Sequence, residues 1–259
     1  MQHKDPTGRF SDRANFYAAN RPKYPPVLLD KIQEFLHLGP RTRIADLGSG
    51  TGIFTRLLLG TGARVYGIEP NEQMRVQAES ALASVPNFTS VAGRAEATTM
   101  PDGSIDLVTV AQALHWFKFN EARAEIGRIL VPGGCIAVVW NKRLREGSLF
   151  NKAYERFLQE TCPEYNPSEF MEYAEDRFND FLNQSALRSF SVPNDQELDW
   201  NGLQGRFLSA SYAPRADKRD IAQVLARLRK IFDEHQVKGV VTMLTTTRMF
   251  YGRFESALQ

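Results

Sequence analysis

The chain has 259 residues, of which 42% are hydrophobic and 24% charged, and its formal net charge is +2. This length allows one or two domains with a sizeable core, and the composition excludes a wholly disordered, collagen-like or coiled-coil protein. So small a net charge creates no strong overall field that would recruit nucleic acid or an anionic membrane.

Targeting and metal-binding signals are not expected either. The N-terminal residues contain no apolar segment typical of a secretory signal, and the apolar runs are shorter than the roughly 18 residues that cross a bilayer. Cys135 and Cys162 are too few for a disulfide framework, and the four histidines show no metal-ligand spacing. We therefore expect a cytoplasmic protein with neither a metal nor a membrane partner, and the oligomeric state stays open.

The first expected helix begins near two prolines. Pro25 and Pro26 suit the first turn of a helix, and apolar residues then recur at helical spacing as far as Leu36. Strand and helix patterns alternate from residue 42 onward. The expected strands span residues 42–47, 63–68, 88–92, 105–111 and 135–140, and the expected helices span 53–59, 71–83 and 120–130.

Local signals support these boundaries. Asn71 is a suitable N-cap for the helix that follows it, and Pro132-Gly133-Gly134 is expected to end the helix before it. Strands that alternate with helices at this spacing predict an α/β fold, a Rossmann-like, doubly wound and mostly parallel sheet.

The pattern changes after Asn141. Residues 145–183 are aromatic and helix-like, residues 187–192 favour a strand, 202–212 and 218–235 favour helices, and the β-branched stretch 240–254 predicts one last strand. Four units follow. They are an N-terminal lid and helix (1–41), a cofactor-binding core (42–141), a helical insertion or substrate cap with one sheet strand (142–236), and a C-terminal strand that completes the core sheet in antiparallel orientation (237–259).

The most informative stretch is IADLGSGTG, residues 44–52, which follows a strand and opens a helix. Glycines let the backbone turn sharply close to a ligand, and the helix start offers unpaired N–H groups. This is the design of a nucleotide-type cofactor site. The dinucleotide pattern GxGxxG fails because Ile53 stands three residues after Gly50. Glu69, at the end of the second strand, suits the hydroxyl groups of a ribose.

These motifs resemble those of class I S-adenosylmethionine-dependent methyltransferases. IADLGSGTG is similar to the first motif of that superfamily and VYGIEPNEQM to its second, while GRAEATTMPDGSIDLV and LVPGGCIAVVW resemble the segments around its fourth and fifth strands. A closer resemblance, to the family of trans-aconitate methyltransferase within the type 11 methyltransferases, involves YAANRPKYP, AQALHWF, GLQGRFLSASYAP and FYGRF.

The resemblance implies S-adenosylmethionine as cofactor and S-adenosylhomocysteine as product. It assigns Gly48, Ser49 and Gly50 to the methionine part, with Asp46 fixing their turn. The other implied cofactor contacts are Glu69 (ribose), Pro70, Arg94, Ala95 and Glu96 (adenine side), Ala111 and Gln112 (methionine side), and Tyr17 and Arg21, which would close the pocket. An arginine suits the carboxylate of the cofactor.

The resemblance also implies an acceptor side, formed by His115, Trp116, Ser209, Ser211 and Tyr212. We expect methyl transfer to a small molecule, with a carboxylic acid as the preferred acceptor class. A carboxylate needs no general base, whereas a hydroxyl or amine could use His115 as the catalytic base. His115 also fits a purely structural role, and the basic residues of 206–230 fit either a solvated helix face or a site for an anionic acceptor.

Two alternatives remain at this point. An NAD-dependent oxidoreductase is disfavoured by the missing GxGxxG, and a non-catalytic regulatory protein that binds S-adenosylmethionine would share the cofactor motif. Nucleic acid is not an expected partner, because no [N/D]PP[Y/F] sequence follows the fourth strand. The methyl acceptor, its reacting atom and the pathway are left open.

Overall fold

The computed structural model describes residues 21–34, 36–166, 188–210, 212–214 and 221–254. The apolar strands of the first half assemble into one sheet with the order β3-β2-β1-β4-β5-β9-β6. Its members are β1 (Arg43–Leu47), β2 (Arg64–Ile68), β3 (Phe88–Val91), β4 (Ile105–Ala111), β5 (Leu130–Arg143), β6 (Arg188–Pro193) and β9 (Thr245–Arg253). The first five strands are parallel, and β9 is antiparallel to both of its neighbours. The predicted Rossmann-like sheet with an antiparallel last strand is confirmed.

Helices cover both faces of this sheet because side chains alternate along each strand. Val108 and Val110 of β4 point to one face, where they pack against α5 (Phe119–Ile129). Leu107 points to the other face, which is covered by α2 (Val27–Gln33), α3 (Ile53–Leu59) and Leu82 of α4 (Glu72–Leu82). The expected cap at Asn71 is present, since its side chain accepts a hydrogen bond from the Met74 N–H.

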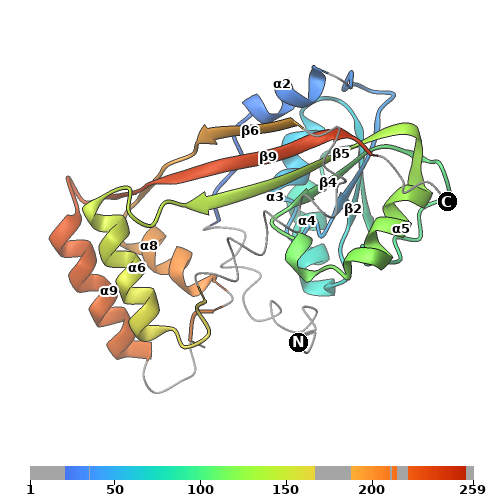
Figure 1. Cartoon of the computed structure of the whole chain (residues 1–259). Coiled ribbons are helices and arrows are strands. Elements are labelled where there is room, and N and C mark those ends of the chain that lie inside the picture. The colour runs from blue at the N-terminus through green and yellow to red at the C-terminus, as the bar shows by residue number, and fades with distance from the viewer. Residues whose placement is uncertain (1–20, 35, 167–187, 211, 215–220, 255–259) are drawn as a thin grey trace.

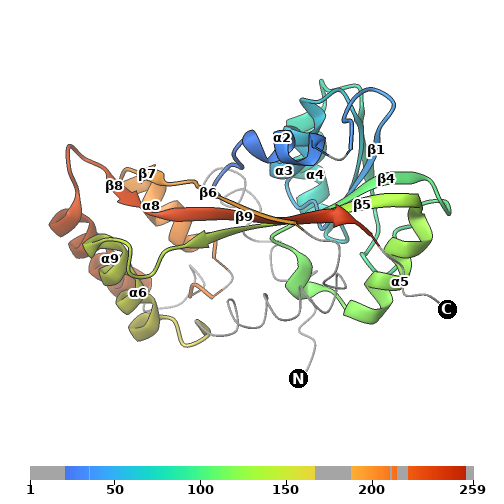
Figure 2. The same cartoon turned by 45° about the horizontal axis from the view of Figure 1, so that its top comes forward.

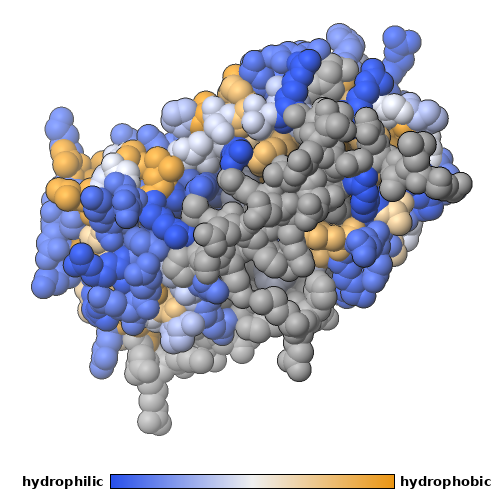
Figure 3. All heavy atoms as spheres, in the orientation of Figure 1, coloured by the Kyte–Doolittle hydropathy of each residue, from blue (hydrophilic) through white to orange (hydrophobic). Residues whose placement is uncertain are grey.

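A second lobe lies at the far end of the long strands β5 and β9 (Figures 1 and 2). This cap lobe contains α6 (Leu149–Thr161), α8 (Trp200–Leu208), α9 (Ile221–His235) and a two-stranded sheet of β7 (Gln196–Leu198) and β8 (Val241–Met243). It has its own hydrophobic cluster, in which the rings of Phe157 and Phe207 meet edge to face at 5.3 Å. The described surface of the cap lobe in Figure 3 is mainly hydrophilic, with small hydrophobic patches.

Two predicted boundaries are wrong, and a third prediction is only partly covered by the described residues. Pro132-Gly133-Gly134 lies within β5 instead of before it, because the pairing jumps from Ile105 with Leu130 to Leu107 with Cys135 and the extra residues bulge out of the ladder. The helix predicted for 202–212 ends at Leu208. Most of the helix-like stretch 145–183 beyond α6 lies outside the described residues.

The stretch 240–254 forms two strands instead of one. Leu244 separates β8 from β9, and both of its backbone groups are bound by the side chain of Asn151: Nδ2 donates to the Leu244 carbonyl at 3.0 Å, and Oδ1 accepts from its N–H at 3.1 Å. A buried asparagine on α6 therefore divides the segment, so that β8 joins the cap lobe and β9 the core sheet. Among the described helices, none combines the length and the apolar character that a bilayer crossing requires.

Candidate active site

The strand order reverses between β1 and β4, and the crevice outside the carboxyl ends of such strands is where open α/β sheets bind ligands. The turn from β1 to α3 lies there. Gly48, Gly50 and Gly52 all have positive φ angles of 66°, 57° and 80°. A Cβ atom on Gly48 would lie 2.5 Å from the Cβ of Ala113, so the turn also packs too closely for a side chain.

Asp46 ties this turn to the sheet. Its carboxylate accepts hydrogen bonds from Thr55 Oγ1 of α3 at 2.6 Å and from Thr109 Oγ1 of β4 at 2.8 Å. Burial raises its pKa to about 6, although both hydroxyl groups oppose the shift. The side chain thus joins the end of β1 to the next helix and the neighbouring strand. This geometry fits the predicted role of fixing the turn.

Glu69, directly after β2, reaches across to the same turn. One carboxylate oxygen accepts from the Gly50 N–H at 3.0 Å and the other from the Asn71 N–H at 2.9 Å. Burial raises the pKa of Glu69, while these hydrogen bonds and Arg75 oppose the rise. Each oxygen keeps a second acceptor position, so the hydrogen bonds orient the carboxylate without using up its capacity for ribose hydroxyls.

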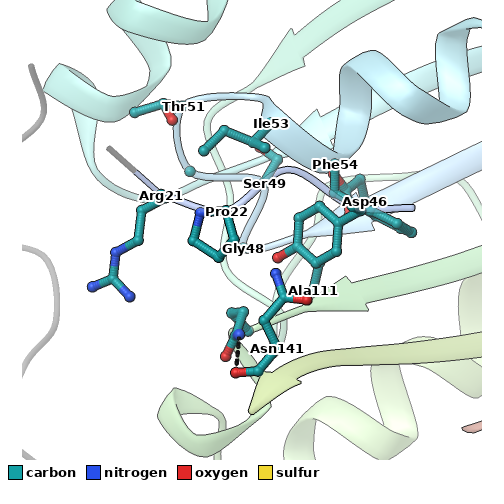
Figure 4. Close-up of a pocket in the computed structure, with 13 residues that line it drawn as sticks. Arg21, Pro22, Asp46, Gly48, Ser49, Thr51, Ile53, Phe54, Ala111 and Asn141 are labelled. Carbon is teal, nitrogen blue, oxygen red and sulfur yellow. Dashed lines mark hydrogen bonds between the residues drawn. The ribbon is translucent and has the colours of Figure 1, made fainter. Parts of the chain in front are cut away.

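A hollow with about 480 Å³ of empty space, part of it open to solvent, lies beside the glycine turn. Seven of the predicted residues line it: Arg21, Asp46, Gly48, Ser49, Gly50, Ala111 and Gln112. Six more were not singled out from the sequence: Pro22, Tyr24, Thr51, Ile53, Phe54 and Asn141. Figure 4 shows them around the turn, with the Arg21 guanidinium extending away from Asp46. The rings of Tyr24 and Phe54 meet edge to face at 4.8 Å.

Two polar groups in this wall point to a ligand. Thr51 Oγ1 and Asn141 Nδ2 are buried and have no hydrogen-bond partner within the part of the chain that the structure describes. Buried polar groups are normally paired. Asn141 is held in place at two points. Its side-chain Oδ1 accepts from Thr247 Oγ1, and its backbone carbonyl accepts from Gln112 Nε2 at 3.0 Å, the dashed line in Figure 4. An acceptor atom on a ligand would satisfy the remaining N–H.

The backbone of Gln112 adds strain at the same place. Its φ is 58°, which is uncommon for a residue with a side chain, and its N–H is fixed by a 3.0 Å hydrogen bond to the Val139 carbonyl. Such outliers concentrate at ligand sites. Asn141 could have been found from the sequence, because it directly follows the apolar run of β5, the strand beside β4.

The predicted adenine-side residues lie outside the set that lines the hollow. Ala95 is buried in the hydrophobic core, the Arg94 N–H donates to the Ala97 carbonyl at 3.2 Å, and Glu96 accepts from the Lys118 N–H at 2.7 Å. The Pro70 carbonyl accepts from Arg75 Nη1. Their predicted contacts with a cofactor stay predictions.

His115 and Trp116 lie in a short 3-10 helix, η3 (Leu114–Trp116), after β4. The imidazole of His115 is 4.6 Å from the Trp116 ring and 5.2 Å from the Trp140 ring, between centroids. Burial, and next the positive charge of Arg21, lower the pKa of His115 to about 3. The imidazole is therefore neutral at physiological pH and is a weak proton acceptor.

The remaining predicted acceptor residues belong to the cap lobe. Ser209 is buried at the end of α8, and its carbonyl accepts from Arg21 Nη2 at 2.9 Å, which joins the hollow to the cap lobe. The Tyr212 ring meets that of Tyr165 edge to face at 4.8 Å. Tyr17 and Ser211 lie outside the described residues.

Comparison with known proteins agrees with this geometry. Residues 45–138 match the family model described as a methyltransferase domain. An uncharacterised methyltransferase of Mycobacterium tuberculosis is 36% identical over 140 residues, 54% of this chain and 55% of that protein. This chain thus spans about half the length of the curated relatives that it matches at this level.

Two longer matches extend beyond the domain. An uncharacterised methyltransferase of Schizosaccharomyces pombe is 28% identical over 229 residues, covering 85% of this chain and 86% of that protein. The solved structure of a protein assigned as a type II methyltransferase of Anaeromyxobacter dehalogenans superposes with a TM-score of 0.66 at 22% identity, covering 91% of this chain and 98% of that one. The likeness to the solved structure concerns the fold alone.

A methyltransferase domain such as the one described by the family model that residues 45–138 match implies S-adenosylmethionine as the cofactor. The residues present fit such a group. The glycine turn leaves room for close approach, since a Cβ on Gly50 would meet nothing within 4 Å. The wall also offers a buried hydroxyl and a buried amide N–H in need of an acceptor, from Thr51 and Asn141. A cofactor with hydroxyl, amino and carboxylate groups matches this donor set.

Proposed function

We propose that the protein transfers a methyl group from S-adenosylmethionine to a small molecule, with a carboxylic acid as the acceptor class. The observation that carries the proposal is the hollow at the strand-order reversal, where a glycine turn, two unpartnered buried polar groups and a strained Gln112 meet within a methyltransferase domain. An NAD-dependent oxidoreductase gains no support from these comparisons.

The bound sulfonium cofactor would supply an activated methyl group, so the protein has mainly to position the reactants. Good alignment alone is worth roughly 7–11 kcal/mol of the barrier. The turn at Gly48–Gly50 would hold the methionine part, and Glu69, already oriented by the Gly50 and Asn71 N–H groups, would bind the ribose hydroxyls. Arg21 would bind the carboxylate of the cofactor from the mouth of the hollow.

Proton balance supports the proposed acceptor class. A carboxylate is ionised at neutral pH and needs no base, and the low pKa of His115 makes that histidine a poor base for a hydroxyl or amine acceptor. His115, Trp116 and Tyr212 would then contact the acceptor without transferring a proton. The resemblance of the motifs YAANRPKYP and GLQGRFLSASYAP to the trans-aconitate methyltransferase family also supports an acidic acceptor.

The test begins with calorimetry of S-adenosylhomocysteine binding. Glu69→Ala removes both ribose acceptors and should weaken binding about tenfold or more, since a hydrogen bond to a charged group contributes about 1.5–3 kcal/mol. Glu79→Ala, on the exposed side of α4, is the matched control and should bind as the wild type does. Equal affinity in Glu69→Ala and the control would contradict the site.

The second stage measures methyl transfer from labelled S-adenosylmethionine to a panel of small acids, phenols and amines. Turnover with an acid supports the acceptor class. Cofactor binding without turnover on any member would favour a regulatory protein, and affinity for NAD without affinity for S-adenosylhomocysteine would overturn the proposal as a whole.

A further inference from the structure

Three arginines from separate parts of the chain act on one another between the cap lobe and the core lobe, which comprises the seven-stranded sheet and its flanking helices. Arg143 ends β5, Arg206 lies in α8, and Arg21 precedes α2. Arg21 Nη2 donates to the Ser209 carbonyl at 2.9 Å, one turn beyond Arg206, whose own carbonyl accepts from Ser209 Oγ at 2.8 Å. Burial, then the like charge of Arg21, lower the pKa of Arg206 to about 10, and the charge of Arg143 acts in the same direction.

Arg143 is held rigidly with one side of its guanidinium unused. Nη2 donates to Glu155 Oε2 at 2.6 Å and to the Tyr165 hydroxyl at 3.0 Å, and the group lies 5.0 Å above the Tyr154 ring. Only 12% of the side chain is exposed. Nη1 is nevertheless buried without a hydrogen-bond partner among the described residues. A donor this well fixed and this poorly satisfied is expected where a ligand supplies the acceptor.

Among the described residues, this cluster brings together more positive than negative charge. Glu155 is the carboxylate that faces Arg143, and it is shared with Arg145 at 3.9 Å. The hydrogen bond of Arg206 is a long one, 3.4 Å from Nε to the neutral amide oxygen of Gln196. Like charges brought together away from water are costly unless an anion accompanies them. A bound anion would relieve this repulsion and accept from both guanidinium groups.

We propose that Arg143 and Arg206 form a carboxylate-binding site in the cap lobe that anchors the methyl acceptor by an acidic group other than its reacting atom. A planar guanidinium matches the two oxygens of a carboxylate, and an oxygen held by two such groups has few lone pairs left for attack on a methyl group. The anchoring group and the nucleophilic atom must therefore be separate. Arg21, which lines the cofactor hollow and contacts the cap lobe, connects the two sites.

The inference rests on the proposed function, so binding is measured apart from turnover. Ligand-observed NMR on the full chain, with and without S-adenosylhomocysteine, would compare small carboxylic acids with their neutral amides and with inorganic phosphate. At least one acid should bind, and its amide should bind about tenfold or more weakly. Arg206→Gln should weaken acid binding about ten- to a hundredfold. Arg206→Lys keeps the positive charge but lacks the planar guanidinium, so its affinity for acids should lie between those of the wild type and Arg206→Gln.

Arg156→Gln is the matched control, because Arg156 is exposed on α6 of the same lobe. It should bind acids as the wild type does. With an accepted substrate, Arg206→Gln should raise KM more than it lowers kcat and leave S-adenosylhomocysteine affinity unchanged. Equal acid binding in the Arg206→Gln and control variants, no acid binding at all, or phosphate binding in place of carboxylates would overturn the inference. Failure of S-adenosylhomocysteine to bind while acids still bind would instead overturn the proposed function.

Discussion

The core lobe and the cap lobe are held together in different ways. The core lobe grows from short neighbouring segments, in which β1, β2 and β4 are each followed by a helix and the ligand site arises at a turn of five residues, 48–52. The cap lobe joins α6, α8, α9 and the β7/β8 pair, from segments spread between residues 149 and 243, around one aromatic cluster. The first lobe can therefore be inferred from local motifs, whereas the second depends on long-range packing. The division also suggests that the core lobe binds the cofactor and the cap lobe selects the acceptor.

A pair of phenylalanine variants tests this division with the largest expected effect. Phe157 of α6 and Phe54 of α3 are each 2% exposed, and only Phe54 lines the hollow. Each change to alanine should lower the free energy of unfolding by about 3–5 kcal/mol, because a large buried side chain is lost and a cavity remains. Denaturant titration measures that loss, and calorimetry measures S-adenosylhomocysteine affinity in the same samples.

The two variants should differ in cofactor binding. Phe157→Ala should keep the wild-type affinity, whereas Phe54→Ala should lose about tenfold through the damaged wall of the hollow. If Phe157→Ala loses as much affinity as Phe54→Ala, the cap lobe is part of the cofactor site and the division does not hold.

The pH dependence of stability gives the next largest effect, and it arises in the core lobe. The pKa of Asp46 is raised from 3.8 to about 6, so the folded chain binds a proton that the unfolded chain has lost between these values. Stability from this group is therefore complete below pH 4 and is lost as the pH rises through 6. Asp46→Asn cannot titrate. The free energy of unfolding of the wild type minus that of the variant should fall by about 2 kcal/mol between pH 4 and pH 7.

Denaturant titrations of both proteins at several pH values measure this difference. Carboxyl groups remote from Asp46 cancel in the subtraction, whereas Glu69, whose charge acts on Asp46, contributes a smaller part. A difference that stays constant from pH 4 to pH 7 would show that Asp46 titrates normally and that its hydrogen bonds to Thr55 and Thr109 outweigh its burial.

The strand and helix order of the core lobe could be predicted because each element carries its own signal. The apolar run Ile105–Ala111, the N-cap Asn71 and the glycine turn all act within a few residues. The division of the last segment between the cap lobe (β8) and the core lobe (β9) could not be predicted in this way. The break at Leu244 depends on Asn151, which is 93 residues away in the chain, and no local pattern carries that information.

The candidate site shows the same limit. The motif points to Gly48–Gly50 and Glu69, and the structure brings these residues together. Asn141 belongs to β5, and the sheet order places β5 beside β4. That Asn141 lines the hollow is therefore visible only in the assembled sheet. The arginine cluster is less predictable still, because Arg21, Arg143 and Arg206 are separated by more than a hundred or by about sixty residues. A basic stretch at 206–230 indicated only that charge was present.

Substitutions at two glycines distinguish the cost of close packing from the cost of backbone strain, and the expected difference between the two variants is smaller than the loss of stability in the phenylalanine variants. Gly48 and Gly103 have similar φ angles of 66° and 56°, but a Cβ would lie 2.5 Å from Ala113 at Gly48 and in open space at Gly103. Gly103→Ala should therefore cost only the strain of the left-handed conformation, about 1–2 kcal/mol. Gly48→Ala should cost about 1–3 kcal/mol more through overpacking and should also weaken S-adenosylhomocysteine binding. Equal stability and affinity in the two variants would mean that the turn tolerates a side chain.

His115 lies in η3, shortly after β4, and its replacement should have the smallest effect on cofactor binding. With a pKa of about 3 the imidazole is neutral from pH 5 to pH 9, so its protonation cannot shape activity in that range. His115→Gln should leave S-adenosylhomocysteine affinity within about twofold of the wild type and lower turnover through lost acceptor contact. The pH–rate profiles of the two enzymes should keep the same shape. A rising limb near pH 6.5 that is present in the wild type and absent in the variant would make His115 a general base, and the acceptor would then be a hydroxyl or amine instead of a carboxylate.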